Sequence, residues 1–217
     1  MPTSPSSESL LTYATQLTTS GLLFRGQHAN LSVRSGAGMS MTRGGHIAHL
    51  TADDVGWVGF DGTGQENFEP TFREVIDMHR RIYIARADLC GIIHCHAPHL
   101  TAFAVAQKPL PIGYEPLLRV GLYEDIPVIA WAPRGSSASV DGILTAFHNP
   151  ATGAVLLANH GVLVTGTDLA SAFTRLTLLE EAAELALQAS ALGGMKPLPA
   201  EAYAEVKARQ TQFRPAP

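Results

Sequence analysis

The sequence predicts a mixed α and β fold in which helices flank a central, mostly antiparallel sheet. Apolar residues recur at helical spacing in several segments, short β-type runs are interspersed among them, and two pairs of these runs are joined by tight turns. The 217 residues are enough for one full domain with a large core. We therefore expect a single domain over residues 1–217, with a flexible tail from about residue 208.

The first half of the chain contains two helical patterns and several short strands. Apolar residues from Glu8 to Ser20 have helical spacing and end at a Ser-Gly pair. Asn30 to Val33 is a β-type run, and the SMT segment after a glycine-rich bend completes a hairpin. Thr51 can cap a short turn before the strand GWVGFD, which ends at the turn Asp61-Gly-Thr-Gly. A helix is predicted from Arg73 to Arg86, and it leads into the strand GIIHCHA.

The second half of the chain continues this alternation. A helix is expected from Pro98 to Val105, followed by a proline-rich loop and the apolar run IPVIAW. ILTAFHN is interpreted as the end of a helix, and AVLLANHGVLVTG as a strand, a turn and a second strand. Leu169 to Leu192 has the longest helical pattern. The final segment, LPAEAYAEVKARQTQFRPAP, predicts a short helix followed by a disordered end.

Composition and charge disfavour several classes of function. A net charge of −4 and a pI near 6.1 lack the basic excess of a nucleic-acid-binding protein. No stretch reaches the roughly 18 uninterrupted apolar residues of a membrane helix, and the N-terminus does not resemble a secretory signal. A hydride-transferring enzyme is disfavoured because GxGxxG after a strand is missing. We expect a cytoplasmic protein with small-molecule partners, in which Cys90 and Cys95 stay thiols.

Three histidines form a candidate metal site. His94 and His96 stand two residues apart on a predicted strand, so their imidazoles project to the same side, whereas Cys95 between them faces the opposite side. His160 is the third candidate, at the end of an apolar strand, where the following glycine lets the backbone turn sharply. Three neutral imidazoles with an open position are typical of a catalytic divalent-cation site. Ordinary structural roles are expected for the histidines at positions 28, 46, 49, 99 and 148.

The order of several motifs resembles the class II aldolase and adducin family over about residues 8 to 195. The motifs are GQHANLSVR, GMSMTRGG, EPTFREVIDMHRRIYIARADLCGIIHCHAPHLTAFAVA and LLANHGVLVTG. The resemblance implies a three-layer α/β/α fold and a divalent cation held by His94, His96 and His160. Zinc is the expected cation, with manganese, cobalt and nickel as alternatives. It also implies a homotetramer with active sites between subunits.

The resemblance further implies an acid that binds the cation or transfers a proton, and Glu74 is the expected residue. In the family a histidine follows this acid by four residues, whereas His79 follows Glu74 by five. A shift of one residue on a helix rotates a side chain by about 100°. Asp77 is therefore kept as the alternative.

Other residues match family positions around the substrate. Asn30 matches a contact to the phosphate or hydroxyl end, and Gly44 and Gly45 match a loop whose backbone amides cradle an anion. Arg43 in the same loop can contact a carboxylate or phosphate. Thr71 occupies the first of two serine positions of the sugar-phosphate aldolases, and a phenylalanine occupies the second. A carboxylated or unphosphorylated substrate is thus an alternative to a sugar phosphate.

Such a site fits the cleavage or formation of a C–C bond. A cation chelated by a carbonyl and its neighbouring hydroxyl stabilises an enediolate, while a carboxylate moves the proton. Tyr114 resembles the family tyrosine that protonates the leaving aldehyde from the neighbouring subunit. The sequence therefore predicts a metal-dependent aldolase of a sugar, sugar phosphate or keto acid. A decarboxylase or epimerase of the same family is an alternative, and so is a noncatalytic adducin-like scaffold, although retention of the three histidines argues against the scaffold.

Overall fold

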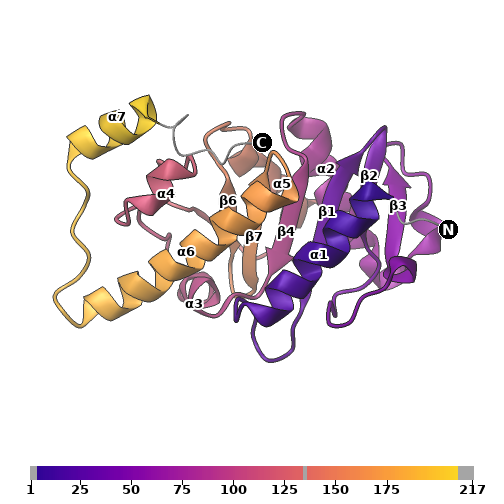
Figure 1. Cartoon of the computed structure of the whole chain (residues 1–217), viewed down its shortest axis with the longest axis horizontal. Helices are drawn as coiled ribbons and strands as arrows, with labels where there is room; N and C mark the ends of the chain where they lie inside the picture. Colours follow the sequence, from indigo (N-terminus) through magenta and orange to yellow (C-terminus); the bar gives the residue numbers. More distant parts are fainter. Residues whose placement is uncertain (1–3, 134–135, 210–217) are drawn as a thin grey trace.

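The computed structural model describes residues 4–133 and 136–209, and its centre is a seven-stranded sheet (Figure 1). The strand order is β3-β2-β1-β4-β7-β6-β5, and every neighbouring pair is antiparallel except β5 with β6. The predicted, mostly antiparallel sheet is confirmed. The strands are β1 Ala29–Ser35, β2 Gly38–Thr42, β3 Val55–Gly59, β4 Gly91–Cys95, β5 Val128–Ile129, β6 Ala154–Leu157 and β7 Gly161–Gly166.

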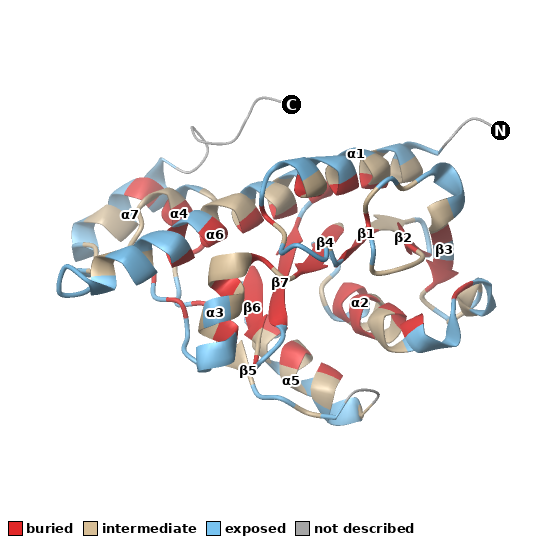
Figure 2. Ribbon diagram, turned by 90° about the horizontal axis from the view of Figure 1, so that it is seen from below, coloured by how far each residue is buried: buried red, intermediate tan, exposed pale blue. Residues whose placement is uncertain are grey.

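Helices cover both faces of the sheet, which gives the three-layer α/β/α fold (Figures 1 and 2). One face carries α1 Pro5–Thr19, α3 Pro98–Ala106 and α6 Leu169–Ser190, with α4 Pro116–Arg119 against α6 and α7 Ala200–Ala208 against α4. The other face carries α2 Arg73–Ala85 and α5 Ser137–Phe147. In the described residues, short 3-10 helices lie in the connections at Ala52–Asp54, Gln65–Asn67 and Pro70–Phe72.

Strand residues alternate between two apolar cores, and this alternation decides which way the candidate histidines point. Ile93 and Cys95 of β4 are fully buried in the core beneath α1 and α6. Ile92 belongs to the core beneath α2 and α5, and His94 shares its face because successive strand residues point to opposite sides. The expectation that Cys95 is a buried thiol on the opposite face from the histidines is confirmed.

Local sequence explains where several elements begin. The first helix starts at Pro5, three residues before the predicted Glu8, because Ser4 caps it: the Ser7 amide donates to Ser4 Oγ at 3.2 Å, and proline suits the first helical position. Thr51 donates through its amide and hydroxyl to Asp54, at 2.7 and 2.9 Å, in the predicted turn. The run IPVIAW supplies only the two residues of β5.

The C-terminal segment folds as far as α7, which confirms its predicted short helix. Most of the tail that was expected to be flexible, residues 210–217, lies outside the described residues. The single domain over residues 1–217 stays a prediction. Among the described helices, none combines the length and the hydropathy that a bilayer-spanning segment requires.

Candidate metal centre

The imidazoles of His94, His96 and His160 converge at the end of β4. One ring nitrogen from each histidine lies within 4.8 Å of the other two. The ring centroids are 4.8 Å apart for His94 and His160, 5.0 Å for His96 and His160, and 5.6 Å for His94 and His96. Nitrogen ligands at ~2.0–2.1 Å from a tetrahedral zinc ion lie about 3.3 Å from one another. Small ring rotations are therefore enough for the three histidines to share one cation.

His94 is oriented by the neighbouring strand. Its Nδ1 lies 2.9 Å from the carbonyl oxygen of Val162 on β7, and because a carbonyl only accepts, Nδ1–H is the donor. This tautomer leaves the lone pair of Nε2 for a metal, as in many histidine ligands. Burial, and then the charges of His160 and His96, lower the pKa of His94 well below its ordinary value. Burial also lowers the pKa of His96, with a smaller effect of His28. The neutral imidazoles fit a divalent cation.

His160 lies in the turn between β6 and β7, and the role expected for its glycine neighbour is wrong. The left-handed backbone belongs to Asn159, with φ of +57°, not to Gly161. Gly161 is needed for close packing instead: a Cβ there would lie 2.5 Å from the carbonyl oxygen of Cys95 and 2.8 Å from Cδ2 of His96. The glycine thus lets β7 start directly against the end of β4, beside the three histidines.

The two candidate acids lie in different surroundings. Glu74, in the first turn of α2, lines a cavity of about 320 Å³ together with His94 and His160. Asp77, one turn later, does not line this cavity, and its carboxylate lies 2.8 Å from Arg80 and 3.9 Å from Arg81. The structure therefore brings Glu74, and not Asp77, to the cavity that holds two of the histidines.

Asn30 lies directly across from His94 in the register of β1 and β4, and its side chain is almost fully buried. Its Oδ1 lies 2.7 Å from Nε2 of His79, and Nδ1 of His79 lies 2.7 Å from Oγ of Ser32. Burial lowers the pKa of His79 to about 3, so this ring is neutral. Tyr83 extends the network by donating to the carbonyl of Ser32 at 2.9 Å.

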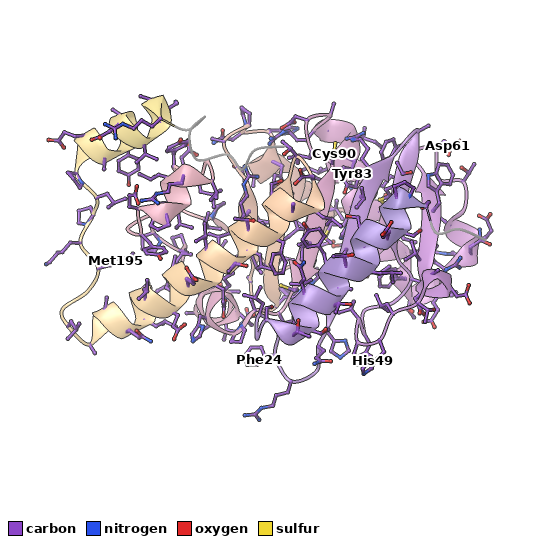
Figure 3. All side chains as sticks on the ribbon, viewed as in Figure 1. Phe24, His49, Asp61, Tyr83, Cys90 and Met195 are labelled. Atoms are coloured by element: carbon purple, nitrogen blue, oxygen red, sulfur yellow. The ribbon has the colours of Figure 1, made fainter. Side chains whose placement is uncertain are left out.

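The sequence pattern does not predict this network. In the sequence, His79 indicates only the spacing that follows the candidate acid Glu74. The signal in the sequence that could indicate the network is the presence of polar residues, Asn30, Ser32 and His79, within otherwise apolar elements. Figure 3 shows Tyr83 beside Cys90, and the Tyr83 hydroxyl lies 3.4 Å from the Cys90 carbonyl oxygen.

The glycine loop lies close to the histidine end of the sheet. The Gly45 carbonyl accepts from the Ala29 amide at 2.8 Å, and a Cβ on Gly45 would lie 3.8 Å from Nδ1 of His28. The ring of His28 is in turn 6.5 Å from that of His96. Gly44 has open space around it. Figure 3 shows Phe24 and His49 at this same edge of the molecule.

The other predicted contact residues are engaged elsewhere in the single chain. Arg43 donates to the carbonyls of Val55 at 3.2 Å and Asn67 at 2.6 Å. Thr71 is exposed, and its hydroxyl donates to Glu69 at 3.4 Å. Tyr114 packs against the core beneath α6, on the face of the sheet opposite the cavity, and its hydroxyl lies 3.5 Å from Glu181.

Comparison with known proteins identifies the family. Residues 8–187 match the Class II Aldolase and Adducin N-terminal domain. The chain is 32% identical over 176 residues to a 5-methylthioribulose-1-phosphate/5-deoxyribulose-1-phosphate aldolase of Rhodospirillum rubrum, covering 81% of this chain and 77% of that relative. It is 27% identical over 161 residues to an L-fuculose phosphate aldolase of Methanococcus maripaludis, covering 74% and 84%.

The solved structures agree with this comparison. An L-fuculose 1-phosphate aldolase superposes with a TM-score of 0.82 at 27% identity, covering 98% of each chain. Because the family match extends over most of the sequence and the fold matches the same family, the chain belongs to the class II aldolase and adducin family.

Proposed function

We propose that the protein is a divalent-metal-dependent aldolase, a lyase that cleaves or forms a C–C bond of a hydroxy-carbonyl compound. The observation that carries this proposal is the cluster of His94, His96 and His160, two of which, His94 and His160, line a cavity together with Glu74. The names of the relatives support it, because they are aldolases of deoxy, methylthio and fuculose sugar phosphates. A sugar, a sugar phosphate or a keto acid is the proposed substrate, which places the enzyme in carbohydrate metabolism.

The three histidines would hold the cation, with zinc as the first choice and manganese, cobalt or nickel as alternatives. Lewis-acid polarisation of the substrate carbonyl is the chemistry that such a cation supplies. The chain's own part is to keep His94 and His96 neutral, because burial lowers the pKa of both, and to align His94 through its hydrogen bond to the Val162 carbonyl. A scaffold without catalytic activity would not require this arrangement, and a decarboxylase or epimerase would use the same site.

Glu74 is proposed to move the proton between the substrate hydroxyl and the reacting carbon. Its place in the first turn of α2 puts a carboxylate at the cavity wall next to the histidines. Asp77 is the weaker candidate, because Arg80 and Arg81 already pair with its carboxylate outside this cavity.

The polar end of the substrate is proposed to meet Asn30 and the amides of Gly44 and Gly45, which lie at the same end of the sheet as the histidines. Arg43 and Thr71 are proposed as further contacts, after their present hydrogen bonds are exchanged for the substrate.

We propose a homotetramer in the cytoplasm with active sites between subunits. Tyr114 faces the opposite side of the sheet from the cavity of its own chain. It would therefore protonate the leaving aldehyde in the site of a neighbouring subunit.

Aldol cleavage by the zinc-loaded full chain tests this function. Fuculose 1-phosphate and 5-deoxyribulose 1-phosphate are the substrates to assay first. Glu74→Gln is expected to keep its metal and lose at least a hundredfold in kcat, because general acid–base catalysis typically contributes ~10²–10⁴. Asp77→Asn is the matched control and should lose far less. Equal losses in the two variants, or an unaffected Glu74→Gln, would refute the proposed role of Glu74.

A further inference from the structure

His79 is a fully buried histidine outside the cluster of His94, His96 and His160. It lies in the middle of α2, which packs against the part of the sheet formed by β1 and β2 (Figure 2). The residues nearly one turn before and after it, Ile76 and Ile82, are fully buried and belong to the apolar core beneath α2 and α5. An apolar side chain at position 79 would suit this core better than an imidazole, so packing alone does not account for the histidine.

The hydrogen bonds of His79 determine which of its ring nitrogens carries the proton. Nε2 lies 2.7 Å from Oδ1 of Asn30, and because an amide oxygen only accepts, Nε2–H is the donor. The ring is neutral, since burial lowers its pKa to about 3. Nδ1 therefore has no proton and accepts from the hydroxyl of Ser32 at 2.7 Å. The hydroxyl proton of Tyr83 goes to the Ser32 carbonyl, at 2.9 Å.

The donor on His79 fixes the orientation of the Asn30 side chain. The oxygen and the NH₂ group of an asparagine have nearly the same shape, so a half turn of the amide exchanges their positions. A donor at Nε2 of His79 is compatible only with the orientation in which Oδ1 faces α2. An apolar side chain at position 79 would leave Oδ1 without a partner there, and both orientations of the amide would be open.

The NH₂ group of Asn30 remains available to a ligand. Among the described residues, Nδ2 of Asn30 has no hydrogen-bond partner. It is also not sealed from solvent, because the fully buried side-chain atoms without a partner in that part of the chain belong to other residues: Arg80, Thr101 and Tyr123. Asn30 stands directly opposite His94, and the Cβ atoms of opposite residues in antiparallel strands are ~4.5–5.5 Å apart. The N–H donors of Asn30 therefore lie beside the histidine cluster.

We propose that His79 is a positioning residue, which acts on the substrate through Asn30. It holds Oδ1 of Asn30 toward α2, so that the NH₂ group faces the polar end of the substrate as a hydrogen-bond donor. An acceptor oxygen at that end is bound, and a group that offers only a donor is rejected. This inference rests on the proposed function, which assigns Asn30 to the polar end of the substrate.

Two substitutions of His79 separate this role from packing. In His79→Gln the amide nitrogen reaches the position of Nε2 of the imidazole, so a donor to Asn30 is kept. In His79→Asn the side chain is one CH₂ shorter, so its amide reaches the position of Nδ1 beside Ser32 but not Asn30. Both variants exchange a buried imidazole for a smaller buried amide. Denaturant unfolding of the two variants measures the cost in stability that they share.

Cleavage kinetics of the zinc-loaded full chain are measured with the sugar phosphate that the wild type cleaves fastest. His79→Asn should raise KM about tenfold or more, because an aligned hydrogen bond to a charged group is lost. Its kcat should stay within about threefold, because the contact is remote from the reacting carbon. His79→Gln should keep KM within about threefold of the wild type. Equal increases of KM in the two variants, or a loss of kcat with KM unchanged, would overturn the proposal.

Neutron diffraction from crystals of the perdeuterated wild-type chain tests the orientation of Asn30 without a variant and without activity. Deuterium is expected on Nε2 of His79 and not on Nδ1, with the ND₂ group of Asn30 turned away from α2. Deuterium on Nδ1 alone would overturn the proposal, because Asn30 would then donate to Nε2 and present its oxygen to the substrate. If the wild type cleaves no sugar phosphate, the proposed function fails, while the neutron result still decides whether His79 orients Asn30.

Discussion

The carboxylate of Glu180 on α6 binds the backbone of His99 in the first turn of α3. Glu180 Oε1 accepts from the His99 amide at 2.7 Å and lies 2.8 Å from its Nδ1, while Oε2 accepts from the Leu100 amide at 3.0 Å. The side chain of Glu180 is buried, at 7% exposure. Because α3 begins two residues after His96, this contact fixes the chain that leaves the cluster of three histidines.

Glu180→Gln is therefore expected to loosen the position of His96. An amide group replaces one oxygen that receives N–H donors, which should lower the free energy of unfolding by about 2 kcal/mol. The dissociation constant for zinc should rise by about tenfold, the lower end of effects from residues behind metal ligands. Denaturant unfolding and competition with a chelator measure the two effects. Glu184→Gln, an exposed position on the same helix, is the control, and an equal loss in both variants would rule out this role.

Gly161→Ala is expected to separate the start of β7 from the end of β4. The added Cβ would lie 2.5 Å from the Cys95 carbonyl oxygen. Because this oxygen belongs to the backbone of β4, it cannot move away without distorting the strand. Overpacking of this kind typically costs ~1–3 kcal/mol, and metal binding should weaken with it because His160 and His96 flank the contact. Gly44→Ala, which meets open space, should leave both the unfolding free energy and the metal content unchanged. The same stability for the two variants would show that the packing argument is wrong.

The free energy of unfolding should decrease as the pH falls below neutral, because of His79. Burial lowers its pKa to about 3 in the folded protein, against an ordinary value of 6.5. Between these values the unfolded state binds a proton that the folded state does not, so the contribution is complete above pH 6.5 and is lost as pH falls. At pH 5 the loss from this residue is about 2 kcal/mol.

The effect can be isolated with His79→Gln in the metal-free protein. The free energy of unfolding is measured from pH 7 to pH 5 in both proteins. The wild type should show the steeper decline, by up to about 1.4 kcal/mol per pH unit. Parallel curves would mean that His79 takes up its proton without cost in the folded state.

The sequence was sufficient to predict the features that depend on local periodicity. The alternation of side chains in β4 placed His94 and His96 on one side and Cys95 on the other, and the apolar runs on either side of His160 were recognised as strands. Family resemblance added the third layer of the fold. These predictions succeed because a strand or helix fixes the direction of its own side chains.

Features that depend on packing between distant elements could not be predicted in this way. Whether Glu74 or Asp77 faces the cavity depends on where α2 starts, at Arg73, and on the arginines that follow. The capping of α3 by Glu180 depends on the placement of α6 against α3, and Glu180 appears in the sequence only as one polar residue of a long helix. The role of Gly161 cannot be predicted from its own segment, because its constraint comes from β4, the neighbouring strand.

His94, His96 and His160 are expected to bind one divalent cation together. Elemental analysis of the purified full chain, beside His94→Ala/His160→Ala, tests it most directly. We predict close to one equivalent of divalent metal per chain in the wild type, and loss of nearly all of it in the double variant, which should remain folded by circular dichroism. Wild-type protein that holds no metal even after incubation with zinc, manganese, cobalt or nickel, or a folded double variant with full metal content, would show that the three histidines do not form the metal site.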